Sequence, residues 1–332
     1  MNQKENLISV RDLIVEYKSG GETIHAVNGV SFDLESGKTI GLVGETGAGK
    51  TSIAKAILRI LPDHATQKAE GKIYFKGKDL QAVSEKEMRT YRGKSISMIF
   101  QDPMTALNPV KPAVNQIAEG LRLHQNMSKA ESIREAVKML EMVGISEDRA
   151  GEYPHQFSGG MKQRVVIAIA LACNPELLIA DEPTTALDVT IQAQVMDLMK
   201  KLQRELGTAL ILITHDLGVV ADICDTVAVV YAGEIVEFGS KEEIFDHPSH
   251  PYTVGLFGAL PDLSKNVRRL SPVEGLPPDP SNLPAGCSFA PRCPYASDEC
   301  KKTGVEMRSL GGTHRVRCIR FGKEGEYGAA GN

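Results

Sequence analysis

A glycine-rich loop between a buried strand and a helix constrains this chain more than any other feature. Residues 44–51 read GETGAGKT; the apolar run TIGLV precedes them, and the helix-favouring run KTSIAKAILRIL begins within them. Glycines let backbone amides turn inward onto an anion, and the start of the following helix adds the positive end of its dipole. A strand, loop and helix in this order are typical of a phosphate-binding site, so the segment predicts an α/β nucleotide-binding fold.

The loop residues have separate expected roles. Gly44, Gly47 and Gly49 give the backbone its freedom, Lys50 can reach the β and γ phosphates, and Thr51 offers a hydroxyl to Mg²⁺. The predicted nucleotide-binding set at the loop is Gly44, Glu45, Thr46, Gly47, Ala48, Gly49, Lys50, Thr51 and Ser52.

A second phosphate-site element is the run LLIADE at residues 177–182. It predicts a buried strand that carries two carboxylates to its end, beside the loop in a doubly wound sheet. Asp181 is expected to hold Mg²⁺, through water. Glu182 is expected to act as the general base that polarises the attacking water.

The rest of the pattern predicts a mostly parallel sheet covered by helices on both faces. Residues 7–44 contain alternating strands, and 103–153 have helical spacing, with Ser128 as a cap and Gly144 as a stop near SKAESIREAVKMLEMVG. The run AVVYAGEIVEFG predicts a hairpin that turns at Ala232 and Gly233.

Between the two phosphate elements, residues 157–161 read FSGGM, which resembles the signature sequence of ABC ATPases. The resemblance covers about the first 240 residues. Gln101 resembles the glutamine loop of the family, Thr185 to Asp188 its D-loop and His215 its switch histidine. Tyr17 resembles the aromatic residue that stacks on adenine. Phe157 and Met161 depart from the commonest signature, but neither supplies the phosphate contact.

The resemblance implies roles for these residues. Gln101 and His215 join Glu182 in the catalytic set, and Gln101 joins Thr51 and Asp181 around Mg²⁺. Ser158, Gly159, Gly160 and Asp188 complete the nucleotide-binding set. In this family the signature binds the nucleotide of the opposite subunit, so two chains are needed for each site. The expected assembly is a nucleotide-sandwich dimer, which closes when ATP binds and reopens after ATP hydrolysis.

The implied fold is a phosphate-loop (RecA-like) ABC ATPase core with an antiparallel β subdomain, an α-helical subdomain and a cysteine-containing C-terminal extension. We expect the ATPase domain over residues 1–240, with the helical subdomain at about 103–165. The extension covers 241–332, where SPVEGLPPDPSNLP predicts an extended spacer over the domain surface or a linker. The tail KEGEYGAAGN is expected to be disordered.

The chain resembles the D-type ATPase subunit of the dipeptide and oligopeptide permeases in four segments. These segments read FQDPMTALNP, FSGGM, HPSHPYT and GCSFAPRCPYA. This extends the resemblance over nearly the whole chain. It implies a paralogous ATPase partner, two transmembrane permease subunits and an extracellular substrate-binding protein; a homodimer in isolation stays open. Related importers carry nickel, glutathione or oligosaccharides, so the cargo stays open as well.

Four cysteines gather near the end of the chain with the spacing C-x5-C-x6-C-x17-C: Cys287, Cys293, Cys300 and Cys318. Disulfides are not expected in a reducing compartment, and converging thiolates suit zinc or an iron–sulfur cluster. Short zinc knuckles are missing from this spacing. The permease resemblance implies a [4Fe–4S] cluster, with zinc or unliganded thiols as the alternatives. Cys173 and Cys224 are expected to be buried apolar side chains, and His247, His250 and His314 surface loop histidines.

Composition excludes other classes of function. The net charge is −4 with acidic and basic residues interleaved, which gives no basic face for nucleic acid. No run approaches the roughly 20 apolar residues of a membrane span, so we expect a soluble cytoplasmic subunit, peripheral to the inner face of the cell membrane. The competing hypotheses are an ABC ATPase that acts on nucleic acid and an ATPase gated by the redox state of its cluster.

Overall fold

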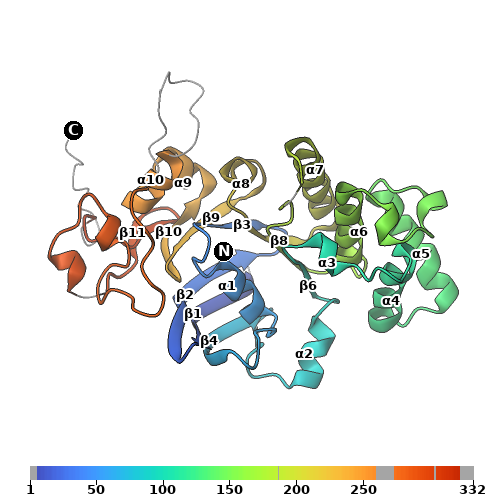
Figure 1. Cartoon of the computed structure of the whole chain (residues 1–332), viewed down its shortest axis with the longest axis horizontal. Helices are drawn as coiled ribbons and strands as arrows, with labels where there is room; N and C mark the ends of the chain where they lie inside the picture. Colours follow the sequence, from blue (N-terminus) through green and yellow to red (C-terminus); the bar gives the residue numbers. More distant parts are fainter. Residues whose placement is uncertain (1–5, 186, 259–272, 303, 322–332) are drawn as a thin grey trace, which may run out of the picture. The chain divides into compact units, whose positions relative to one another are not determined.

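The computed structural model describes residues 6–185, 187–258, 273–302 and 304–321 (Figure 1). The chain divides into two compact units, each made of several stretches. Among the described residues, the first unit comprises 6–8, 33–39, 74–185 and 187–213, and the second comprises 9–32, 40–73, 214–258, 273–302 and 304–321.

The core of the first unit is a set of parallel strands. β7 (Leu177–Asp181) pairs with β6 (Ile96–Ile99) on one side and with β8 (Ala209–Ile213) on the other. Every residue of β7 and β8 is buried, which explains why both sequences are continuously apolar up to the end of the strand. The expected buried strand that ends in a carboxylate is confirmed.

The first unit also contains a helical bundle, in which α4 (Ala113–Gln125), α5 (Lys129–Met142) and α6 (Gly159–Leu171) contact one another, as Figure 1 shows. α5 begins with a capping box, in which the Ser128 hydroxyl and the Glu131 carboxylate each accept a backbone N–H of the other residue. Both the predicted cap and the predicted helical spacing are therefore confirmed.

In the second unit, β3 (Thr39–Val43) pairs in parallel with β9 (Thr226–Tyr231), and β9 pairs antiparallel with β10 (Glu234–Ser240). The β9–β10 hairpin turns at Ala232 and Gly233, whose φ angles are 46° and 78°. Two positive φ angles match the right-handed twist of the strands, which confirms the predicted turn.

The remaining elements complete the two units. A four-stranded sheet has the order β2-β1-β4-β5. Its strands are β1 (Asn6–Ser19), β2 (Glu22–Glu35), β4 (Thr66–Phe75) and β5 (Lys78–Asp79). The other helices of the described chain are α1 (Lys50–Ile57), α2 (Glu85–Tyr91), α3 (Pro103–Ala106), α7 (Val189–Leu206), α8 (Leu217–Ile223), α9 (Lys241–Asp246) and α10 (Pro251–Gly258), with 3-10 turns at Glu147–Arg149, Pro154–Gln156, Ala290–Arg292 and Glu299–Lys301.

The C-terminal segment joins the second unit by strand pairing. β12 (His314–Val316) pairs antiparallel with β10, and β11 (Arg308–Gly311) pairs with β12. The spacer before it lies against β2, because the Pro280 carbonyl accepts the His25 N–H at 2.8 Å. The spacer is thus packed on the domain surface, one of the two expected arrangements.

A buried carboxylate ties this segment to the sheet. Glu237 in β10 is fully buried, and it accepts hydrogen bonds from the backbone N–H groups of Ser249 and His250 at 2.7 and 2.8 Å. Its Oε1 also lies 2.7 Å from Nε2 of His314. A carboxylate removed from water needs such partners, since it would otherwise be strongly destabilising.

The histidine prediction is wrong for two of the three residues. His250 and His314 are only 1% and 6% exposed, and both surround Glu237, whereas His247 is exposed as expected. Burial lowers the pKa of His250 to about 3, so its ring is neutral. Cys173 and Cys224 are buried, as predicted.

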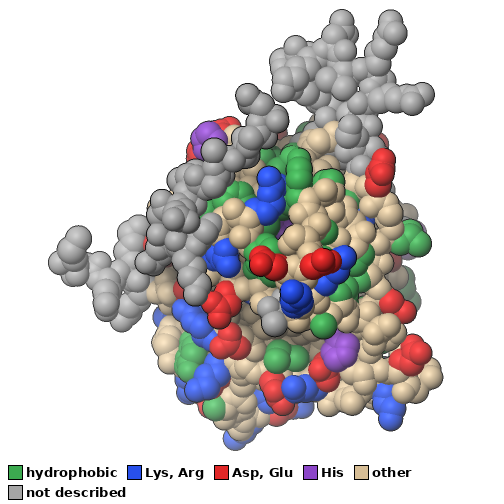
Figure 2. Space-filling view, turned by 90° about the vertical axis from the view of Figure 1, so that its left-hand side faces the viewer, with side chains coloured by type: hydrophobic (Ala, Val, Ile, Leu, Met, Phe, Trp, Pro, Cys, Tyr) green, Lys and Arg blue, Asp and Glu red, His purple; other side chains and the backbone are tan. Residues whose placement is uncertain are grey.

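No helix in the described ranges is both long and apolar enough to cross a membrane. The predicted tail at residues 323–332 lies outside the described residues. On the face shown in Figure 2, acidic and basic side chains are interspersed rather than gathered by sign.

We predict that Glu237→Ala lowers the free energy of unfolding by about 3 kcal/mol, because His314 and two backbone amides lose their buried acceptor. Urea denaturation followed by circular dichroism measures the change. The matched control is Glu242→Ala at an exposed position of α9, which should stay within about 0.5 kcal/mol of the wild type. Equal stability of the two variants would contradict the role assigned to Glu237.

Candidate nucleotide site and four-cysteine pocket

The phosphate loop between β3 and α1 has the backbone that its glycines predict. Gly44, Gly47 and Gly49 have φ angles of 151°, 82° and 99°. A Cβ atom on Gly44 would lie 2.0 Å from the Val230 carbonyl oxygen, and one on Gly49 would lie 2.2 Å from the Ala26 oxygen. Only glycine fits at these two positions, because both φ and space exclude a side chain.

Lys50 opens α1 and points back across the loop. Its side chain is largely buried, and Nζ donates to the carbonyl oxygens of Gly44 at 2.7 Å and Glu45 at 2.9 Å. Thr46 and Gly47 are exposed. The loop therefore presents accessible backbone with a cation held next to it, which suits an anionic ligand.

Tyr17 lies beside the first turn of α1. Its hydroxyl is 3.0 Å from the Ser52 Oγ, and the residue is half-buried at the end of β1. The predicted adenine-stacking residue is thus next to the loop in the structure, within the same unit.

The two carboxylates after β7 lie in different surroundings. Asp181 is only 2% exposed, whereas Glu182 is half-buried. Glu182 has a φ of 46°, a left-handed conformation that costs free energy in a residue other than glycine. Its N–H donates to the Ile213 carbonyl at the end of β8 at 2.8 Å, which helps to hold this conformation.

The Glu182 carboxylate is bound on one oxygen by two side chains. Gln101 Nε2 donates to Glu182 Oε2 at 2.9 Å, and the Thr185 hydroxyl donates to the same oxygen at 3.0 Å. The structure therefore brings together Gln101 and Glu182, which are far apart in sequence. The contact from Thr185 was not predicted, because its position in the sequence indicates only the start of the D-loop.

The signature residues open a helix, as expected. Ser158 is the N-cap of α6 and accepts the Met161 N–H at 3.4 Å, while Gly159 and Gly160 form the first turn. A Cβ atom on Gly160 would lie 2.5 Å from a methyl carbon of Ile191. Ser158 and Gly159 are exposed at the start of the helix, whereas Gly160 is buried against Ile191.

Phe157 and Met161, the two residues that depart from the commonest signature, contact the same arginine side chain. The Arg149 guanidinium lies 5.3 Å from the centre of the Phe157 ring and donates to Met161 Sδ at 3.2 Å. Glu152 holds the same guanidinium with three hydrogen bonds of 2.7 to 3.1 Å. Phe157 and Met161 thus form one packed group that supports the turn, a relation that single motifs could not predict.

Two further predicted residues lie at helix starts. Asp188 caps α7 by accepting the Ile191 N–H at 3.0 Å, and exposed His215 lies two residues after Ile213, the last residue of β8. Gln101, Ser158, Glu182 and Asp188 belong to the first unit, whereas the phosphate loop, Tyr17 and His215 belong to the second.

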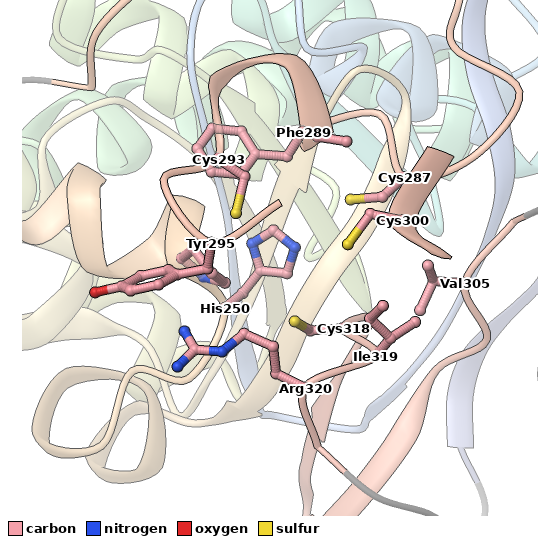
Figure 3. A pocket seen from close by; sticks show the side chains of 12 residues that line it. His250, Cys287, Phe289, Cys293, Tyr295, Cys300, Val305, Cys318, Ile319 and Arg320 are labelled. Carbon is pink, nitrogen blue, oxygen red and sulfur yellow. The ribbon is translucent and has the colours of Figure 1, made fainter. Parts of the chain in front are cut away.

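The four clustered cysteines line one pocket of the second unit. Figure 3 shows the sulfur atoms of Cys287, Cys293, Cys300 and Cys318 around one space, together with the ring of His250. Burial raises the pKa of Cys287 to about 11 in the free-thiol state. Among the described residues, the geometry contains no set of three or more His, Cys, Asp or Glu side chains preformed around a single metal ion.

Comparison with known proteins gives matches over nearly the whole chain. The family profile described as "ABC transporter" matches residues 27–185, and "Oligopeptide/dipeptide transporter, C-terminal region" matches 236–300. The dipeptide transport ATP-binding protein DppD of Bacillus subtilis is 50% identical over 95% of this chain and 94% of its own length. The oligopeptide transport ATP-binding protein OppD of Haemophilus influenzae is 50% identical over 89% and 91%.

A solved structure supports the same assignment. The dimeric ATP-binding cassette MJ0796, in a post-hydrolysis state with ADP and phosphate, has a TM-score of 0.63 and 29% identity, and the match covers 70% of this chain and 98% of that one. The fold and the phosphate loop thus define an ATPase of the ABC cassette class. Within that class, the chain belongs to the family of ATP-binding proteins of dipeptide and oligopeptide transporters.

We predict that Gly49→Ala lowers ATP affinity by at least about a hundredfold, because the new methyl group must displace the loop from the Ala26 carbonyl. Gly120→Ala in α4 is the control, since open space surrounds that position and alanine favours a helix. Equilibrium binding of a fluorescent ATP analogue measures both variants. Unchanged affinity in Gly49→Ala would show that the loop tolerates a side chain there.

Proposed function

We propose that this chain is the ATP-hydrolysing subunit that energises a membrane importer of dipeptides or oligopeptides. The observation that carries the proposal is the glycine-dependent phosphate loop with Lys50 folded over it, in a chain that is 50% identical to a dipeptide transport ATP-binding protein. ATP is then the substrate, and Mg²⁺ is the expected cofactor of such an ATPase.

In this proposal, different residues bind the nucleotide and the metal ion of MgATP. Backbone amides of the loop and the Lys50 ammonium bind the β and γ phosphates, and Tyr17 stacks on the adenine. Thr51, Asp181 and Gln101 would hold Mg²⁺, and their oxygen atoms are the ligand type that this ion prefers. When bound, Mg²⁺ neutralises charge on the β and γ phosphates.

Glu182 takes the proton of the attacking water, and His215 orients the water and the γ phosphate. The support for Glu182 is its strained backbone and its carboxylate, held by Gln101 and Thr185. Gln101 lies just before α3, where the chain enters the helical part. Its hydrogen bond to Glu182 can therefore transmit a change at the site of hydrolysis to these helices.

The signature turn completes the site of a second subunit in this proposal. Ser158, Gly159 and Gly160 present a helix start to the γ phosphate bound by the partner, and Asp188 contributes beside it. The dimeric cassette with bound ADP and phosphate is the solved relative that supports this arrangement. The proposed partner in the cell is a paralogous ATPase, and a homodimer of the isolated chain is the alternative.

An importer also needs subunits that form the path through the membrane. We assign to this chain two transmembrane permease partners, an indirect link to an extracellular binding protein, and a place on the inner face of the membrane. Residues 1–240 act as the ATPase domain, with the helical part at about 103–165, and 241–332 form the extension. Cargo is selected elsewhere, so a nickel, glutathione or oligosaccharide importer is the alternative.

We assign a [4Fe–4S] cluster to the four-cysteine pocket because its four thiols are of the ligand type that such clusters take. Cys287, Cys293, Cys300 and Cys318 are the four thiols of one pocket, and their spacing has no short zinc knuckle. These residues would hold the cluster, which would supply cross-links between distant parts of the extension rather than a step of ATP hydrolysis. Zinc at the same residues is the alternative.

We predict that Glu182→Gln reduces ATP turnover by about a thousandfold while ATP binding persists, because the amide cannot accept the proton of water. Closed dimers should accumulate with ATP, which gel filtration and a phosphate-release assay detect. Glu205→Gln, exposed near the end of α7, is the control and should hydrolyse ATP normally. Turnover near the wild-type rate in Glu182→Gln would remove Glu182 from the role of general base.

We predict that anaerobically purified protein contains about four iron and four sulfide per chain. Cys318→Ser should lose most of the iron, because one of the four ligands is missing. Cys173→Ser is the matched control, since this buried cysteine lies outside the pocket and its loss should leave iron unchanged. Colourless protein that contains zinc would refute the cluster.

A further inference from the structure

Glu45, the second residue of the phosphate loop, is held through every polar group that it has. Its carbonyl accepts from Lys50 Nζ at 2.9 Å, and its N–H donates to the Tyr252 hydroxyl at 2.9 Å. Its carboxylate accepts two hydrogen bonds from Arg292, at 2.9 and 3.0 Å. Two of these partners, Tyr252 and Arg292, lie beyond residue 240, outside the predicted ATPase domain.

The Arg292–Glu45 contact is a two-point ion pair away from solvent. The Arg292 side chain is 5% exposed and that of Glu45 is 27% exposed. Nη1 and Nη2 each bind a different carboxylate oxygen, a fork geometry that fixes orientation as well as distance. Such a pair holds a backbone in place better than an exposed ion pair between two flexible side chains does.

The remaining donors of Arg292 are used by the backbone around it. Nε donates to the Glu274 carbonyl at 2.9 Å, and Nη2 donates to the Val273 carbonyl at 3.1 Å. Nη1 also contacts the Tyr231 hydroxyl at 3.3 Å. These contacts hold the guanidinium in place independently of its hydrogen bonds to Glu45 in the loop.

A buried aromatic cluster sets the position of both partners. Tyr252 is fully buried, and its ring centre lies 4.5 Å from that of Tyr231 and 5.5 Å from that of Phe289. The Arg292 guanidinium lies 5.8 and 6.0 Å from the rings of Tyr231 and Phe289. Neither Tyr252 nor Arg292 can move far without opening this packed cluster.

The same cluster borders the four-cysteine pocket. Phe289 and Cys293, which lie on either side of Arg292 in the chain, both line that pocket (Figure 3). The folded state of the cysteine segment and the position of Arg292 are consequently parts of one local structure.

We propose that Arg292 and Tyr252 are positioning residues for the phosphate loop, through which the C-terminal extension sets the affinity for ATP. The pair holds Glu45 so that the amide groups after it are already arranged for the phosphates. Without the pair, ATP must order the loop at the expense of its own binding energy, so affinity falls while the chemical step at saturating ATP is retained. The inference rests on the proposed role of this loop in binding ATP.

The experiment measures KM and kcat for ATP in Arg292→Ala, Glu45→Ala and the double variant of the full chain. Each single variant should raise KM by about tenfold and change kcat by less than about twofold. The double variant should raise KM no further, because both single changes remove the same interaction. Arg292→Lys, which can reach only one carboxylate oxygen, should restore part of the affinity.

Tyr252→Phe tests the second contact and keeps the ring in its packed cluster. It removes the acceptor of the Glu45 N–H and should raise KM by a smaller factor than Arg292→Ala. Arg315→Ala is the matched control, since Arg315 is an exposed extension residue that contacts Phe238 and is not a partner of Glu45 in any contact found among the described residues. Its KM should equal that of the wild type.

Three results would overturn the inference: wild-type KM in both single variants, additive effects in the double variant, or a loss of kcat without a change in KM. If Arg292→Ala does not fold, Glu45→Gln on the loop side tests the same pair. Lys50→Ala distinguishes the role of the loop in ATP binding from the positioning role of Arg292. Undiminished ATP binding in Lys50→Ala refutes the assignment of the loop itself, whereas lost binding there with unaffected Arg292 variants refutes only the positioning role.

Discussion

Two close approaches of backbone to backbone hold the phosphate loop, and the function of the second unit depends on them. The carbonyl oxygen of Val230 in β9 lies 2.0 Å from the position that a Cβ atom of Gly44 would take, and that of Ala26 in β2 lies 2.2 Å from the position of a Gly49 Cβ atom. Because the loop is pressed between two strands that are far apart in sequence, its amide groups are arranged by the sheet as well as by local preference. A ligand that binds the loop therefore binds a surface already formed by the fold.

Features that depend on neighbouring residues could be predicted from the sequence. The glycine loop, the buried strand ending at Asp181, the Ser128 capping box and the Ala232–Gly233 turn all follow from backbone conformation and hydrophobic period over a few residues. Family membership could also be predicted, since several short motifs in one order are far more specific than one.

Long-range polar contacts could not be predicted in the same way. Glu45 and Arg292 are separated by 247 positions, and nothing near either residue in the sequence indicates the other. His250 and His314 read as loop histidines because the buried acceptor that they surround, Glu237, lies in a strand pattern that otherwise favours apolar residues. In each case the missing information was the partner, and burial makes the partner obligatory.

The two units hold their chemical groups by different means, and this bears on how ATP binding acts. In the first unit, Glu182 is held by a strained backbone and by Gln101 and Thr185 within the unit itself. In the second unit, the loop is held by strands and by the C-terminal segment. The groups proposed to bind and hydrolyse ATP are thus held in place within each unit, so the binding energy of ATP is not needed to arrange them.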